Sequence, residues 1–152
     1  MKNNITIAFA LSLILNVTPS MAAVSCELGS TGLFFGLINP LSSAEVTSIG
    51  TFNLSCTGGP VTYTIKLSQG NGTIAQRVMK SGLNELKYNL YTSNTYSTVL
   101  GDGTAGSLPI NGISANDTTS ATYYAYGKVS NVGLSGTVSA SYSDNISVTI
   151  TY

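Results

Sequence analysis

The chain ends with Ile146-Ser-Val-Thr-Ile-Thr-Tyr152, a stretch that alternates apolar and polar residues up to its last position. Period-two alternation with β-branched side chains is typical of a β-strand that buries one face. Chain ends usually fray unless something holds them, so we expect a strand in this position to lie against a neighbour. That neighbour is either another strand of the same domain or a strand supplied by a second chain.

Upstream of this stretch, short alternating runs follow one another and are separated by Gly, Asn, Ser and Asp. The clearest run has its apolar residues at Val61, Tyr63, Ile65 and Leu67. Further runs are predicted at 51–56, 86–91, 122–129 and 138–142, with a weaker one at 31–35. Two polar, glycine-rich stretches, around 72–84 and 92–121, are predicted to be loops or short edge strands. Strands at this spacing, without a helical pattern or a linker, predict one all-β domain of the sandwich type.

The first 22 residues have the pattern of a secretory signal peptide. Lys2 precedes an apolar stretch from Ile5 to Leu15, and small residues around Ala22 follow it. The apolar stretch is shorter than the roughly 20 residues of a membrane span, and no other segment reaches that length. We expect cleavage after Ala22, which leaves 23–152 as the exported domain. The alternative is a buried N-terminal strand or helix.

The chain has two cysteines, Cys26 and Cys56, and export would place both in an oxidising compartment. We therefore expect a Cys26–Cys56 disulfide, the one pairing that two cysteines allow. A zinc site is not expected because the chain has no histidine to complete the ligands. Six basic and six acidic residues balance each other, so neither nucleic acid nor an anionic membrane is favoured as a partner.

Groups that could perform catalysis are scarce. Without histidine, and with both cysteines paired, His-based triads and cysteine nucleophiles are excluded. Asp102 and Asp117 could form a carboxylate pair, although Asp102 between two glycines is more typical of a turn whose aspartate bonds its own backbone. The spacing Ser-x-x-Lys is absent around the lysines of the exported domain, which are Lys66, Lys80, Lys87 and Lys128. We therefore predict a protein that is not an enzyme and has no cofactor.

Nine tyrosines could provide rings on which sugars stack. Tyr63 and Tyr88 lie on apolar stripes, however, and are expected in the core. Tyr96, in a polar stretch, is the better candidate for an exposed ring.

An ordered set of motifs resembles the spore coat protein U domain, which builds the subunits of archaic chaperone–usher pili. It begins with Cys26, Leu33-Phe-Phe-Gly36 and Cys56-Thr-Gly-Gly59. It continues with Tyr63-Thr-Ile-Lys-Leu-Ser68, Gly70-Asn-Gly72, Arg77-Val-Met79, Leu86-Lys-Tyr-Asn-Leu-Tyr91, Gly101-Asp-Gly103, Tyr126-Gly-Lys128, Gly136 and the stretch from Tyr142 to Tyr152. Leu100 stands where the family usually has a tryptophan.

The resemblance implies an immunoglobulin-like β-sandwich that lacks its last strand. A partner strand would then complete the fold by adding to exposed strand edges. The final strand would border an open apolar groove, in which Ile146, Val148 and Ile150 face Leu33 and Phe35. The implied partners are a periplasmic chaperone, an outer-membrane usher and other pilus subunits, at the cell surface or in a secreted fibre.

One departure concerns the segment ahead of Cys26. Pilins of this family usually carry a donor extension there, whereas cleavage after Ala22 would leave only 23–25, which span about 10 Å at most. The resemblance then implies a subunit that accepts a strand without donating one, as expected of a tip or terminating subunit. The predicted function is a structural or adhesive fibre subunit in attachment and biofilm formation. The alternative is a non-polymerising coat or carbohydrate-binding β-sandwich protein.

Overall fold

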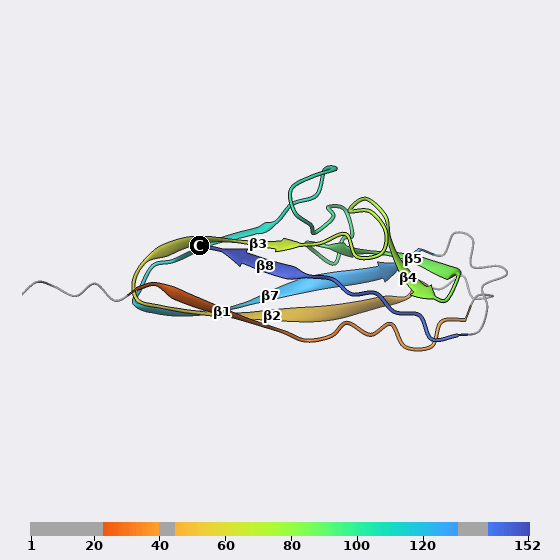
Figure 1. The fold of residues 1–152 in the computed structure, drawn as a ribbon, viewed down its shortest axis with the longest axis horizontal. Coiled ribbons are helices and arrows are strands. Elements are labelled where there is room, and N and C mark those ends of the chain that lie inside the picture. The colour runs from red at the N-terminus through yellow and green to blue at the C-terminus, as the bar shows by residue number, and fades with distance from the viewer. Residues whose placement is uncertain (1–22, 40–44, 131–139) are drawn as a thin grey trace, which may run out of the picture.

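The computed structural model describes residues 23–39, 45–130 and 140–152, which form two antiparallel sheets stacked as two layers (Figure 1). The strands are β1 (Ser25–Ser30), β2 (Thr47–Thr57), β3 (Val61–Leu67), β4 (Arg77–Ser81), β5 (Asn84–Tyr91), β6 (Ile110–Ser114), β7 (Thr118–Val129) and β8 (Val148–Thr151). In this part of the chain there is no helix that could span a membrane. The predicted all-β fold is confirmed.

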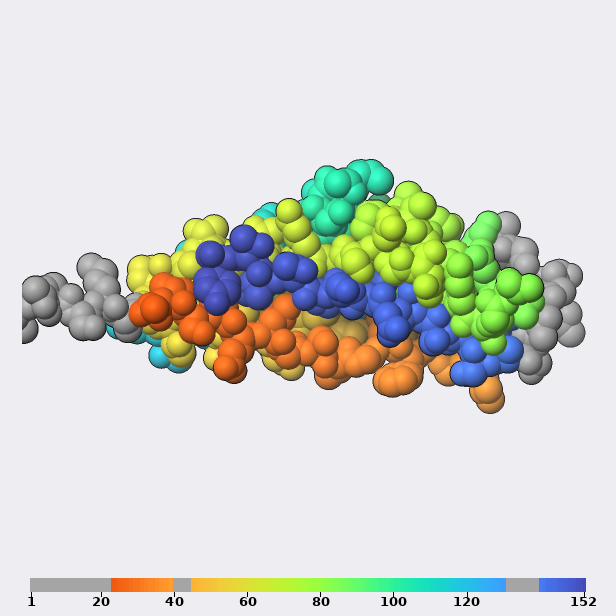
Figure 2. All heavy atoms as spheres, in the orientation of Figure 1, coloured from red at the N-terminus to blue at the C-terminus, as the bar shows by residue number. Residues whose placement is uncertain are grey.

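The larger sheet has the strand order β1-β2-β7-β5-β4, and the smaller sheet has the order β6-β3-β8. β1 is therefore an edge of the larger sheet, and β8 is an edge of the smaller one. Both edges lie on the same face of the molecule, where residues 23–39 and 140–152 run side by side (Figure 2).

The alternating runs form the core between the sheets. In the runs at 51–56, 61–67 and 86–91 the apolar positions are buried, apart from the half-buried Val61, and their neighbours mostly face outward. The described part of the run at 138–142 is not a strand, and its Ala140 is exposed. Buried members are Phe52, Leu54 and Cys56 of β2, Tyr63, Ile65 and Leu67 of β3, and Leu86, Tyr88 and Leu90 of β5. Period two thus assigned the buried face of these strands correctly.

Some boundaries differ from the prediction. The stretch 31–35 is not a strand, and β1 lies immediately before it. β8 begins at Val148 rather than Ile146, because the N–H of Ser147 donates to the Ser68 side chain instead of joining the ladder. The polar stretches around 72–84 and 92–121, predicted to be loops or short edge strands, contain the edge strands β4 and β6. The predicted signal peptide, Gly136 and Val138 lie outside the described residues.

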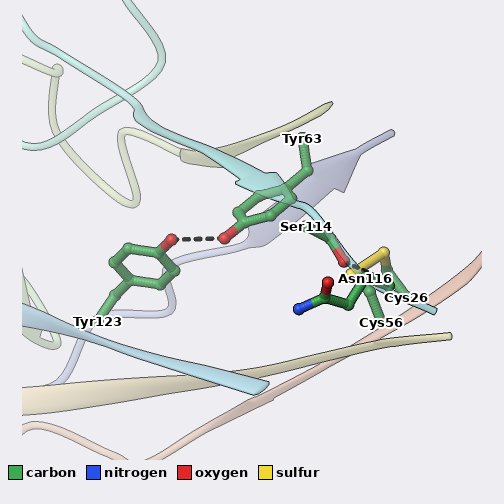
Figure 3. Close-up of a disulfide and its surroundings, with 6 residues drawn as sticks. All are labelled: Cys26, Cys56, Tyr63, Ser114, Asn116 and Tyr123. Atoms are coloured by element: carbon green, nitrogen blue, oxygen red, sulfur yellow. Dashed lines mark hydrogen bonds between the residues drawn. A yellow bond between two sulfur atoms is a disulfide. The ribbon is translucent and has the colours of Figure 1, made fainter. Parts of the chain in front are cut away.

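Two contacts hold the layers and the first hairpin together (Figure 3). The hydroxyls of Tyr63 on β3 and Tyr123 on β7 lie 2.5 Å apart, so one hydrogen bond joins the two sheets. Burial is the main reason that the pKa of Tyr63 is raised to about 12, and this hydrogen bond is the second. Cys26 and Cys56 face each other on β1 and β2 with their Cα atoms 4.1 Å apart and form the predicted disulfide.

Candidate functional site

The C-terminal segment 142–152 crosses from one sheet to the other. Ser143 exchanges two backbone hydrogen bonds with Lys80 of β4, at 2.8 and 3.0 Å. The backbone N–H of Ser68 then donates to the carbonyl of Ser147, and β8 pairs with β3. On its other side, β8 has no partner among the described strands. The neighbour expected for this strand is thus β3 on one side only.

The segment after β1 leaves its sheet at Thr31. The inward residues of β1 are even-numbered, because Cys26 and Leu28 pair with Cys56 and Leu54. Continuing that register would place Leu33 opposite Ile49, whose side chain is 56% exposed on the outer face. Leu33 and Phe35 instead pack against the core. We call Gly32–Ile38 the strap; no backbone–backbone hydrogen bond joins it to another described residue.

A cavity of about 380 Å³ separates the strap from the C-terminal segment. Leu33 and Phe35 line it on the strap side, and Tyr142, Ile146 and Val148 line it on the other. Its floor comes from both sheets and consists of Gly50, Phe52, Leu67, Met79, Tyr88, Leu90 and Ala125. We call this cavity with its two walls the groove.

Four of the five residues that sequence reasoning assigned to a groove lie around this cavity, namely Leu33, Phe35, Ile146 and Val148. Ile150 does not line it. Ile150 lies further along β8, opposite Ile65, and packs against the main core.

Two glycines lie beneath the strap. A Cβ placed on Gly127 of β7 would come within 2.8 and 2.9 Å of the Leu33 δ-carbons and within 2.9 Å of Phe35 Cζ. A Cβ on Gly50 of β2 would meet Leu33 Cβ at 3.5 Å, an ordinary contact. Phe35 also places its ring edge-to-face with Tyr88, at a centroid distance of 5.8 Å.

A set of hydrogen-bonded polar groups lies at one end of the groove. Asp144 accepts hydrogen bonds from the Tyr88 hydroxyl at 2.8 Å and from the backbone N–H of Asn71 at 2.9 Å. The pKa of Tyr88 is raised above its ordinary value, mainly by burial and secondly by the hydrogen bond to Asp144. These bonds hold the C-terminal segment over β5 without closing the cavity.

The side chain of Arg77 stabilises the same end of the groove through hydrogen bonds. Its side chain is fully buried and donates to the Ser68 carbonyl at 2.8 and 3.0 Å and to Asn89 Oδ1 at 2.6 Å. Burial lowers the pKa of Arg77. Because Ser68 also bonds Ser147, Arg77 links β4 to the point where the C-terminal segment joins the smaller sheet.

The remaining sequence candidates do not form a second site. Asp102 Oδ1 accepts from the backbone N–H and hydroxyl of Thr104, which lowers its pKa and matches the expected turn. Tyr96 was expected to be exposed but is half-buried, since its ring packs edge-to-face on Tyr91 and lies 5.2 Å from Lys128 Nζ. Across 23–39, 45–130 and 140–152, no three His, Cys, Asp or Glu residues cluster as metal ligands.

Sequence reasoning missed Asp144 and Gly127 at this site. Asp144 stands between Ser143 and Asn145, a sequence typical of a turn, and nothing in that motif indicates a contact with Tyr88. Gly127 did carry a signal, because a glycine inside a strand often marks a close approach of another segment.

The fold and the groove define an all-β sandwich with an apolar cavity between the strap and the C-terminal segment. Among the described strands, β1 and β8 are edges of their sheets on this face. The Spore Coat Protein U domain family matches residues 12–149, and the chain belongs to this family. The family is structural and non-enzymatic, in agreement with the sequence prediction. No curated protein is similar enough to count as a relative.

Among solved structures, the chain is similar to one in the crystal structure of the CsuC–CsuE chaperone–tip adhesion subunit pre-assembly complex from the archaic chaperone–usher Csu pili of Acinetobacter baumannii. The identity is 20% and the TM-score is 0.58, a likeness that concerns the fold alone. The alignment covers 86% of this chain but only 40% of the solved one.

Proposed function

We propose that this protein is a subunit of a surface fibre and that its groove accepts a β-strand from a partner chain. The observation that carries the proposal is the apolar cavity of about 380 Å³ between the strap and the C-terminal segment. One wall continues into β8, which has a free edge among the described strands. Unpaired backbone groups beside an apolar surface are costly, and an added strand would satisfy them.

The partner strand would run between the strap and β8. Its main chain would bond to these two edges, and every second side chain would enter the cavity. Leu33, Phe35, Ile146 and Val148 would contact those side chains, and Ile150 would extend the apolar surface along β8.

In this proposal the groove has two successive occupants. A strand of a periplasmic chaperone fills it after export, and a strand from another subunit replaces the chaperone strand at an outer-membrane usher. The solved chain to which this protein is similar belongs to a chaperone–subunit complex, which supports a chaperone as the first partner. The assembled fibre would lie at the cell surface and act in attachment and biofilm formation.

A non-polymerising coat or sugar-binding protein would have a filled groove instead. The proposal therefore requires a signal peptide at 1–22, an exported domain at 23–152 and an intact apolar wall on β8. Val148 provides a test of that wall because its side chain faces the cavity, whereas the next residue, Thr149, is exposed.

The experiment compares Val148→Asp with Thr149→Asp in cells that produce the chaperone and usher. Val148→Asp buries an unpaired charge against apolar partners, so chaperone-bound subunit in the periplasm and fibre on the surface should both be lost. Thr149→Asp should leave both largely unchanged. Full assembly with Val148→Asp would rule out the proposal, and equal losses from the two changes would contradict the assigned faces of β8.

A further inference from the structure

The strap is held by side-chain packing, so the residues beneath it decide where its side chains go. Gly32–Ile38 makes no backbone–backbone bond to another described residue. Leu33 and Phe35 point inward, while Phe34 and Leu37 are 83% and 103% exposed. The inward pair packs low against the larger sheet and lines the cavity, so any movement of these side chains into the cavity would take space that a partner strand needs.

Gly127 makes the low position available. It is buried in the middle of β7, where its neighbours across the ladder are Ser48 and Leu90. Glycine weakens a strand interior, so its presence there has a cost unless another group needs the space. Here the tips of Leu33 and Phe35 occupy the volume that any larger side chain at 127 would fill.

We propose that Gly127 is a positioning residue for strand uptake, an inference that rests on the proposed function. An added methyl group would stand 2.8 Å from the nearest Leu33 carbon, so Leu33 would have to move by about 0.7 Å or more to reach ordinary contact. The end of a leucine side chain can move at little cost in free energy, and the direction open to Leu33 is into the cavity. The folded state would therefore change little, while the space needed by the partner would be lost.

The neighbouring Gly50 supplies the matched control. It also lies under Leu33, but an added Cβ there makes only ordinary contacts at 3.5 Å or more. Gly50→Ala and Gly127→Ala add the same methyl group under the same side chain, and only Gly127→Ala forces Leu33 upward. Because Gly50 itself lines the cavity, Gly50→Ala measures the effect of an added methyl group there without displacement of Leu33. Leu33→Ala supplies a partial rescue, because it removes the two δ-carbons that Gly127→Ala displaces and leaves only the contact with Phe35 Cζ.

The test measures binding of a labelled peptide that alternates Thr with Ile or Val and carries a lysine at each end. The disulfide-bonded domain is used, and its melting temperature without peptide is recorded in parallel. Gly127→Ala should weaken binding at least tenfold with little change in melting temperature, and Gly50→Ala should weaken it clearly less, because it leaves Leu33 in place. In the Leu33→Ala background, where only the Phe35 contact remains, Gly127→Ala should cause clearly less than a tenfold further loss.

Unchanged binding by Gly127→Ala would overturn the inference, as would a further tenfold loss in the Leu33→Ala background. If Gly127→Ala alone fails to fold, the comparison within the Leu33→Ala variant still tests the inference. Failure of the unaltered domain to bind the peptide would count against the groove itself. The two proposals can therefore fail separately.

Discussion

Tyr63 and Tyr123 show how one pair of side chains can join two sheets. Their hydroxyls share a hydrogen bond in the core, and their rings meet edge-to-face at 6.4 Å between centroids. Tyr63 is almost fully buried, at 2% exposure. Burial without a partner would be costly for its hydroxyl, so the bond to Tyr123 is what permits a tyrosine here.

We expect Tyr63→Phe to lower the free energy of unfolding by about 1 kcal/mol at neutral pH, the usual net value of such a bond. It should also alter the response to alkali. With a folded pKa of about 12 against an ordinary 10.0, the unfolded chain loses this proton first, so stability falls as the pH rises from 10 to 12. Denaturant unfolding across this range measures both effects.

Tyr124→Phe is the control for this prediction, because Tyr124 lies on the same strand as Tyr123 but is 50% exposed. It should leave stability at neutral pH nearly unchanged and retain the alkaline loss. A Tyr63→Phe domain that loses stability between pH 10 and 12 as steeply as the unaltered domain would contradict the role assigned to Tyr63.

At the scale of elements, β1 is held by one sheet neighbour and one covalent bond. Cys26 lies near its start and is bonded to Cys56 of β2, 30 residues later. The strand ends at Ser30, so the disulfide and six ladder pairs anchor the segment that precedes the strap. The strap would otherwise be attached to a fraying edge.

We expect replacement of both cysteines by serine to destabilise the domain by roughly 3–4 kcal/mol, the loop-closure value for a separation of this length. Denaturant unfolding of the two forms gives the difference, and mass spectrometry with and without reductant verifies the bond in the exported chain. Recovery of two free thiols from the exported chain, or equal stability of the two forms, would refute this prediction.

At the scale of the whole molecule, the described part of the sandwich has an apolar groove on the side of β1 and β8. The smaller sheet has three strands against five in the larger one, and the groove lies where a further strand beside β8 would complete it. A strand that binds only the folded domain acts as a stabilising ligand.

We therefore expect the purified domain to have low stability and to melt at a higher temperature with the alternating peptide. At a hundredfold excess over its dissociation constant the gain is about 2.7 kcal/mol, which corresponds to a rise on the order of 10 °C. A peptide with Asp in place of Ile and Val is the control and should have no effect. A high melting temperature that neither peptide changes would mean that no strand is missing.

The amino-acid sequence by itself determined the faces of the strands and the pairing of the cysteines. Alternation at 61–67 and 86–91 predicted which side chains are buried, because side chains on a strand alternate whatever the strand packs against. Two cysteines allow only one bridge. The ordered motifs also identified the family correctly.

Only the tertiary structure decided where along the chain the inward-facing residues change from even-numbered to odd-numbered positions. Leu33 and Phe35 are inward although the register of β1 would turn them outward, since the strap leaves β2 after Thr31. Asp144 meets Tyr88, and Gly127 lies beneath Leu33, across 56 and 94 positions of the chain. Periodicity describes one segment at a time, whereas these contacts depend on how two sheets and a crossing segment are stacked, which no local pattern records.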